Sequence, residues 1–168
     1  GIPADPLFLS ASPVDRIGEL VFTTGMEGYL ETLTDPSYFG QIVTQTFPLI
    51  GNYGVIEEDF EGSSTLFGYI VRELCDTPSN FRSAYPLNDY LVARGIPGLC
   101  GVDTREIVRI TREEGVMNAL ICDQVPEDLS APVFHRLRCE VPQLPGAELR
   151  IGELLNERGL DLAVLFVE

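Results

Sequence analysis

The chain has 168 residues, of which 45% are hydrophobic and 22% charged, a composition typical of one globular domain with a substantial core. Its formal net charge is −15, and all 11 of its basic residues are arginine. A surface this acidic repels phosphate backbones, which argues against nucleic-acid binding. We therefore expect a single domain over residues 1–168 whose acidity serves solubility or, alternatively, offers an acidic face to a basic partner.

Membrane and metal sites are also disfavoured. Apolar runs are much shorter than a membrane span, and no basic segment followed by an apolar core marks a signal peptide. These features predict a cytoplasmic protein. The cysteines have no C-x-x-C spacing, and with His135 as the single histidine we expect neither a metal centre nor a cofactor. We interpret the four cysteines as buried apolar filler: Cys75, Cys100, Cys122 and Cys139.

Short strands and turns fill the first half of the chain. Strands are predicted at residues 7–11, 17–24, 41–47 and 66–74. The last of these has few polar interruptions, so burial on both faces is expected. A two-turn helix over 26–33 follows from four apolar residues on one helical face: Met26, Tyr29, Leu30 and Leu33. Residues 48–55 are expected to form a loop rich in glycine and asparagine.

The second half adds two clearer helices. Residues 86–95 begin with proline and end with glycine, as a short helix does. Asp103 caps the next helix, Glu106 completes a capping box, and Gly115 ends it. Strands are predicted at 96–102 and 116–123. Strands and helices thus alternate, which favours an α/β sandwich over an all-β fold.

One face of the 103–115 helix carries an arginine stripe. Arg105, Arg109 and Arg112 fall at positions i, i+4 and i+7. Two interpretations stay open. The stripe pairs with carboxylates elsewhere, including those of a partner, or it is a solvated face paired locally with Glu106 and Glu113. In either case we expect Ile107 and Ile110 to face the sheet, with the arginines less buried.

The "GLCG" segment at residues 98–101 is a decoy for a catalytic cysteine. A nucleophile elbow has the form G-x-C-x-G, and here Val102 stands where the second glycine belongs. A cysteine nucleophile also needs a base, and His135 has no acidic partner at a short spacing. We therefore expect Cys100 to be a packed strand residue.

The segment Thr34-Asp35-Pro36-Ser37 lies between the predicted 26–33 helix and the 41–47 strand. Proline fixes its own φ angle and disfavours helical geometry at the residue before it, so a turn is predicted here. A hydroxyl on such a turn can reach a ligand, and a plain Asx or Ser/Thr turn is the alternative. We expect Ser37 to be exposed, on a turn closed by Asp35 or Pro36.

Three stretches together resemble the N-terminal domain of the carbamoyl-phosphate synthetase small subunit. They are "GELVFTTGMEGYLETLTDPSYFGQIVTQTFPLIGNYGV", "IVRELCDTPSNFRS" and "LNDYLVARGIPGLCGVDTREIVRITREEGVMNALI", in the family's order over residues 18–122. The resemblance implies a three-layer β/β/α sandwich that carries no catalytic residue. It also implies that the domain docks on the large subunit and supports the glutaminase of an adjoining amidotransferase domain. By the same resemblance, Ser37 contacts the substrate glutamine.

The two ends depart from the family pattern. Residues 160–168 resemble the family's first strand, whereas residues 4–13 resemble only the second arm of its opening hairpin. We therefore expect a circular permutation in which residues 162–167 pair antiparallel with residues 7–11. Residues 142–159, with the helix-like "GELLNERG", would then be the connector. The alternative is an unrelated strand or a helix extension packed elsewhere.

These observations predict a non-catalytic small-subunit domain of glutamine-hydrolysing carbamoyl-phosphate synthetase, serving arginine and pyrimidine synthesis. The 168 residues contain no G-x-C-x-G elbow and no His-x-Glu, so we expect the chain alone to have no glutaminase activity. The main alternative is a free-standing or engineered interaction module that keeps the fold without the synthetase role. An independent enzyme that uses Cys100 or a carboxylate pair is the third possibility.

Overall fold

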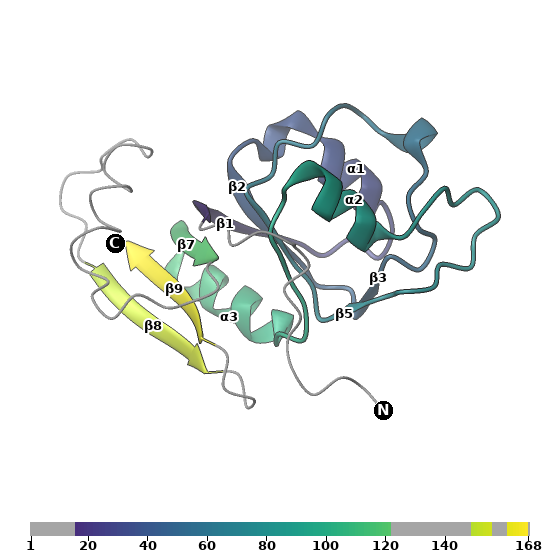
Figure 1. The fold of residues 1–168 in the computed structure, drawn as a ribbon. Coiled ribbons are helices and arrows are strands. Elements are labelled where there is room, and N and C mark those ends of the chain that lie inside the picture. Colours follow the sequence, from purple (N-terminus) through teal and green to yellow (C-terminus); the bar gives the residue numbers. More distant parts are fainter. Residues whose placement is uncertain (1–15, 122–148, 156–160, 168) are drawn as a thin grey trace.

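The computed structural model describes residues 16–121, 149–155 and 161–167. Its centre is a five-stranded sheet with the strand order β6-β4-β2-β1-β7 (Figure 1). The first four strands of that order run parallel to one another, and β7 pairs antiparallel with β1 at the edge. The strands are β1 (Arg16–Thr23), β2 (Gln41–Gln45), β4 (Gly68–Ile70), β6 (Gly98–Leu99) and β7 (Met117–Ile121).

Two smaller pairs of strands lie outside this sheet. β3 (Leu49–Ile50) pairs parallel with β5 (Glu73–Leu74). β8 (Leu149–Leu155) pairs antiparallel with β9 (Asp161–Val167), and β9 runs close to β7 (Figure 1).

The helices are short and each has an identifiable start or end. Three α-helices are described: α1 (Tyr29–Thr34), α2 (Leu87–Arg94) and α3 (Thr104–Glu114). Gly95 ends α2 in the left-handed conformation, with φ of 63°. Two 3₁₀ turns complete the set: η1 (Pro36–Tyr38) and η2 (Glu57–Asp59). No helix within the described ranges has the length and apolar character that a bilayer crossing requires.

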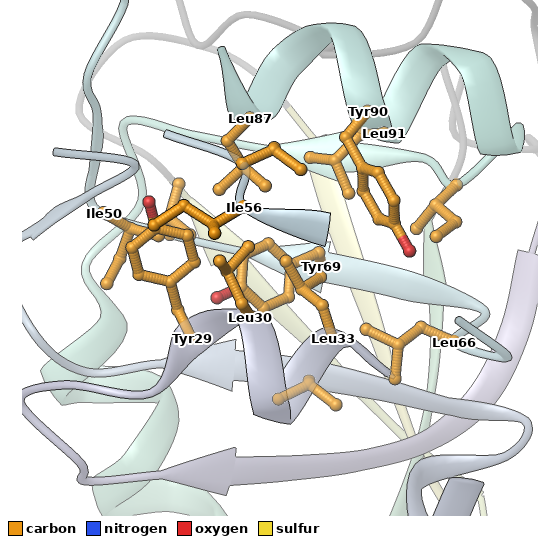
Figure 2. Packing of buried hydrophobic residues seen from close by; sticks show 14 residues of the cluster. Tyr29, Leu30, Leu33, Ile50, Ile56, Leu66, Tyr69, Leu87, Tyr90 and Leu91 are labelled. Carbon is orange, nitrogen blue, oxygen red and sulfur yellow. The ribbon is translucent and has the colours of Figure 1, made fainter. Parts of the chain in front are cut away.

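Side chains on one face of the sheet pack against α1 and α2. Alternate strand residues point to the same face, so Val43 of β2 and Tyr69 of β4 join this core. Figure 2 shows α1 and α2 closing over it with Leu30, Leu33 and Leu91. All five of these side chains are fully buried. The helix that precedes the predicted glutamine contact is therefore fixed by the main core of the domain.

A second core lies against α3. The residues next along the same strands, Ile42 of β2 and Ile70 of β4, belong to it together with Ile107. Ile107 is buried and Ile110 packs against the cluster while remaining partly exposed. The predicted phase of this helix is confirmed.

The α/β class and most of the predicted elements within residues 16–121 are confirmed, with corrections to their bounds. The 66–74 run is not one strand: β4 ends at Ile70, and β5 pairs with β3 in another sheet. The 48–55 segment contains a strand, β3. The predicted 26–33 helix begins only at Tyr29, because Gly28 is its left-handed cap, and Met26 is exposed.

The C-terminal predictions have mixed outcomes. The first four residues of the helix-like "GELLNERG" segment, residues 152–155, lie in strand β8. The prediction of a helix there is wrong. Residues 162–167 are extended as expected and pair with β8. Their proposed partner, residues 7–11, lies outside the described residues, so the permutation stays a prediction.

Candidate functional site

The candidate site is the turn that follows α1, residues 35–39, called the Ser37 turn below. Asp35 leaves the helix in an extended conformation, with φ of −68° and ψ of 118°. Pro36 then occupies the first position of η1, where its fixed φ angle suits the turn and its missing N–H is not needed. Ser37 is exposed in the middle of η1, as predicted.

The Asp35 carboxylate closes the turn. Its Oδ1 accepts a hydrogen bond from the Ser37 backbone N–H at 2.8 Å. The Asp35 N–H donates to the Glu31 carbonyl at 2.8 Å, so the residue joins the end of α1 to the start of η1. Hydrogen bonding from the Ser37 N–H, and next from the Ser37 side chain, lowers the pKa of Asp35 from its ordinary value of 3.8. The carboxylate is thus held charged beside the hydroxyl.

Buried residues hold the entrance of the turn. Thr34 is fully buried, and its Oγ1 donates to the Leu30 carbonyl at 2.8 Å. The same oxygen accepts from the Glu61 N–H at 3.0 Å, which ties the turn to a segment 27 residues away. Leu33 of α1, also fully buried, packs into the main core. The position of Ser37 therefore depends on core packing.

The exit of the turn is fixed as well. Tyr38 packs against the core and Gly40 donates to the Thr65 carbonyl at 3.1 Å. Gly40 has φ of 75°, a conformation that favours glycine, and it leads directly into β2. Phe39 lies between them with 71% of its surface exposed, its ring 6.3 Å from that of Phe67. Sequence reasoning did not single out this exposed ring beside Ser37.

The side chains of the Ser37 turn are suited to recognising a ligand through hydrogen bonds. A hydroxyl both donates and accepts hydrogen bonds, and Asp35 supplies a charged acceptor next to it. Within the described residues no group of histidine, cysteine, aspartate and glutamate could hold a metal ion. The turn can therefore orient a polar ligand through hydrogen bonds.

Cys100 follows strand β6 and is half-buried. The prediction of a largely buried residue inside a strand is wrong, because β6 ends at Leu99. Cys75 is also half-buried, with its Sγ 3.4 Å from the Thr77 carbonyl oxygen, so neither cysteine is the fully buried filler expected. Cys122, Cys139 and His135 lie outside the described residues.

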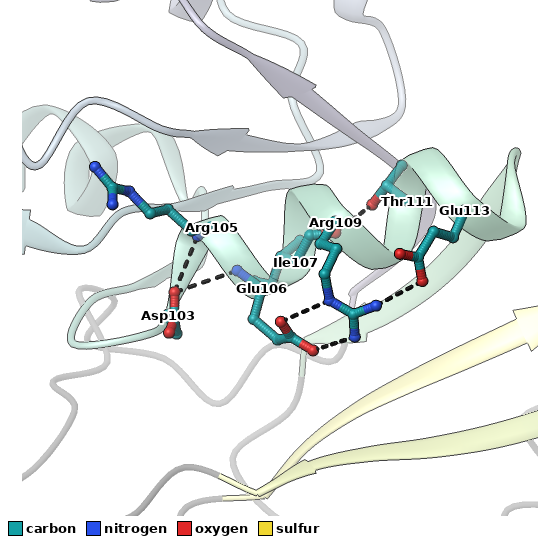
Figure 3. A network of polar contacts seen from close by, with 7 residues as sticks. All are labelled: Asp103, Arg105, Glu106, Ile107, Arg109, Thr111 and Glu113. Carbon is teal, nitrogen blue, oxygen red and sulfur yellow. Dashed lines mark hydrogen bonds and ion pairs between the residues drawn. The ribbon is translucent and has the colours of Figure 1, made fainter.

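The arginine stripe on α3 favours the local interpretation at its centre. Arg109 is held between Glu106 and Glu113, each with a shortest contact of 2.5 Å (Figure 3). All three arginines are exposed, as predicted, and the Arg112 guanidinium lies 5.3 Å from the centre of the Phe22 ring. The Asp103 cap is confirmed, since its Oδ1 accepts from the backbone of Arg105 and of Glu106.

Comparison with known proteins identifies the family. The model of the carbamoyl-phosphate synthase small chain, CPSase domain, matches residues 8–121, about two-thirds of the sequence. The chain belongs to this family. The match contains the Ser37 turn, both cores and α3, and it agrees with the resemblance noted over residues 18–122.

Individual relatives support the same assignment. The chain is 52% identical over 128 residues to a carbamoyl phosphate synthase small chain of Bacillus thuringiensis. The match covers 72% of this chain and 35% of the relative. It is 50% identical over 128 residues to a small chain of Listeria innocua, with 76% and 35% covered. A pyrimidine-specific small chain of Bacillus subtilis is 48% identical over 129 residues, again with 76% and 35% covered. The match thus spans about a third of each curated relative.

Proposed function

We propose that this small-chain domain positions substrate glutamine for an amidotransferase domain and docks on the large chain of the synthase. Arginine and pyrimidine synthesis would be the pathways served, in the cytoplasm. Family membership supports the proposal, and the observation that carries it is the exposed Ser37 hydroxyl on a turn fixed at both ends. A pre-ordered hydroxyl binds a polar ligand at small entropic cost.

Ser37 is proposed to contact glutamine without taking part in bond breaking. Hydrolysis of an amide needs a nucleophile and an effective base within hydrogen-bond reach, and Asp35, the carboxylate beside the Ser37 hydroxyl, is a weak base because its pKa is lowered from 3.8. We therefore propose that the chain alone has no glutaminase activity. Ammonia release from glutamine by the purified chain, abolished by Cys100→Ser, would contradict this statement.

The glutamine contact can be tested in an active enzyme. Residues 8–121 would replace the matching segment of the Bacillus subtilis small chain, and carbamoyl phosphate synthesis would be measured with the large chain. Ser37→Ala is expected to raise the KM for glutamine about tenfold, as a lost hydrogen bond to a polar ligand does, while synthesis from free ammonia stays unchanged. Ser63→Ala, at another exposed serine, is the control. Equal glutamine KM values for the two variants would contradict the proposed contact.

The main alternative, an interaction module without synthetase role, makes a different prediction for docking. The proposed function requires the chain to bind the large chain from the same organism, whereas a free-standing module would not. A pull-down with purified large chain separates them.

We also propose the three-layer β/β/α arrangement and the permuted pairing of residues 162–167 with residues 7–11. The resemblance of residues 160–168 to the family's first strand supports this pairing. Cysteines introduced one at a time at residues 7–11, against Leu165→Cys in a cysteine-free background, would test it by disulfide formation. Cross-linking to a single position is expected, and no cross-linking at any of them would contradict the pairing.

A further inference from the structure

Phe81 is the most exposed of the large hydrophobic residues described, with 97% of its surface accessible. It lies in the long connection between β5 and α2, residues 75–86, called the Phe81 loop below. A single exposed apolar side chain is common and needs no explanation by itself. What distinguishes Phe81 is that its neighbours on both sides are firmly held.

Backbone hydrogen bonds fix the loop before and after Phe81. The Ser79 N–H donates to the Asn52 carbonyl at 3.0 Å. On the other side, the Ala84 N–H donates to the Val55 carbonyl at 2.9 Å, and the Val55 N–H donates back to the Tyr85 carbonyl at 2.9 Å. Val55 is fully buried, so these bonds connect the loop to the core.

A local turn and an ion-pair clamp hold the residues next to Phe81. Asn80 Oδ1 accepts from the Arg82 N–H at 2.9 Å, which closes an Asx turn around Phe81. The Arg82 guanidinium then reaches η2, where it contacts Asp59 at 2.8 Å and Glu58 at 3.2 Å. The ring is thus presented to solvent by a backbone that is already ordered. Aromatic residues displayed in this way are the usual anchors of protein interfaces.

The surface beside Phe81 is acidic. η2 consists of three carboxylates in succession, Glu57, Glu58 and Asp59, and Arg82 is the cation that clamps the last two. Glu57 accepts a hydrogen bond from the Tyr85 hydroxyl at 2.8 Å, which brings it to the same loop. The side chain of Glu58 is 85% exposed. A complementary surface would therefore offer an apolar pocket bordered by arginine or lysine.

We infer that Phe81, flanked by the η2 carboxylates, is the apolar anchor through which this domain docks on a basic-rimmed pocket of a protein partner. The inference rests on the proposed function, under which that partner is the large chain of the synthase. The site is separate from the Ser37 turn: its contact is an aromatic ring with flanking carboxylates, where the Ser37 turn presents a hydroxyl to a small ligand.

Binding of the chain to immobilised large chain from the same organism tests the inference. Phe81→Ala is expected to weaken binding at least about tenfold, since buried aromatic anchors dominate interface energies. Val116→Ala removes another exposed apolar side chain, 71% accessible and directly before β7, and should leave binding unchanged. Thermal unfolding of both variants should match that of the unchanged chain, which shows that lost binding is not lost folding.

The contribution of the η2 carboxylates to docking is tested separately, through the rate of association. Glu58→Gln is expected to slow association and to reduce the salt dependence of the association rate, whereas Glu27→Gln, at an exposed acid outside the Phe81 loop and η2, should do neither. If the unchanged chain binds and Phe81→Ala binds equally well, the inference fails and the docking function stands. If the unchanged chain does not bind, docking fails and the inference fails with it.

Discussion

The Ser37 turn and the Phe81 loop use the same local device to present different chemistry. In each, an Asx side chain accepts the backbone N–H two residues on: Asp35 from Ser37 at 2.8 Å, and Asn80 from Arg82 at 2.9 Å. One turn displays a hydroxyl beside a charge, and the other displays the ring of Phe81. The shared device sets local geometry, while the displayed side chain decides which partner can bind.

The two regions differ in how they are fastened to the domain. The Ser37 turn follows two fully buried residues, Leu33 and Thr34, so the core positions it. The Phe81 loop depends on backbone bonds to its neighbours and on the exposed Arg82 clamp. A site that orients a small ligand needs fixed atoms, whereas an anchor for a protein pocket tolerates adjustment. Mutations in the core beneath α1 should therefore disturb the first region, and salt or mutations of the loop's own contacts the second.

Leu33→Ala should have the largest effect. It leaves a cavity under α1, and the free energy of unfolding is expected to fall by about 2–5 kcal/mol. Leu49→Ala, at a leucine that is 39% exposed, is the control and should cost less than about 1 kcal/mol. Hydrogen exchange should become faster at the Ser37 and Phe39 amides than at the Arg82 and Ser83 amides. Equal acceleration in both regions would show that their anchoring is not separate.

Gly54→Ala should disturb the Phe81 loop specifically. Gly54 has φ of 68°, and an added Cβ would lie 2.8 Å from the Ser83 Cβ. Gly95→Ala is a matched control, because Gly95 has φ of 63° with no atom within 4 Å of an added Cβ. Both variants pay the left-handed backbone cost of about 1–2 kcal/mol. Gly54→Ala should lose about 1–3 kcal/mol more by overpacking.

A double variant tests whether contact with Ser83 causes this loss of stability. Ser83→Gly removes the side chain that the new Cβ would meet, so Gly54→Ala/Ser83→Gly should recover most of the difference from Gly95→Ala in chemical denaturation. If the double variant is no more stable than Gly54→Ala, the clash with Ser83 is not the cause.

Sequence patterns predicted the elements whose boundaries are encoded locally. α3 begins at the Asp103 cap and ends at Gly115, and α2 ends at Gly95, as glycine and capping residues indicate. The prediction of one strand over residues 66–74 was wrong for a physical reason, because one largely apolar run supplies both β4 and β5. Membership in separate sheets depends on which distant strands pair, and the only local mark of the break is the exposed charged pair Arg72 and Glu73.

For the candidate site, too, the sequence predicted the local turn but not the features that depend on distant contacts. The residues around Asp35 and Pro36 predicted a turn from their own chemistry, while the proposed glutamine contact of Ser37 came from resemblance to a family. Phe81 gave no signal in the sequence, where a phenylalanine in a loop suggests burial. Its exposure depends on contacts that its neighbours make: Ser79 bonds to Asn52 and Arg82 to Asp59, each more than 20 residues earlier in the chain.

Acid should weaken the Ser37 turn through Asp35. Its pKa is lower in the folded chain than the ordinary 3.8, so its stabilising contribution is complete above that value and is lost as the pH falls through the folded pKa. Asp35→Asn keeps an acceptor for the Ser37 N–H without the charge. A small decrease in Tm is expected near neutral pH, and the difference from the unchanged chain should vanish in acid. A difference that persists there would contradict this origin.

The smallest effect on stability is expected from the two exposed arginine clamps, at Arg82 and at Arg109. Arg82 contacts Asp59 and Glu58, and Arg109 contacts Glu106 and Glu113, so the pairs are chemically alike. Exposed ion pairs contribute little to stability, and neither Arg82→Gln nor Arg109→Gln should shift the Tm measurably.

The clamps differ in what they connect. The Arg82 contacts join residues 23 and 24 positions apart, whereas those of Arg109 join positions 3 and 4 apart within one helix. Only Arg82→Gln releases a loop, so chymotrypsin should cleave after Phe81 faster in that variant than in Arg109→Gln. High salt should raise cleavage of the unchanged chain towards the same rate, because screening weakens an exposed clamp. Equal cleavage of the two variants would mean that backbone hydrogen bonds alone fix the Phe81 loop.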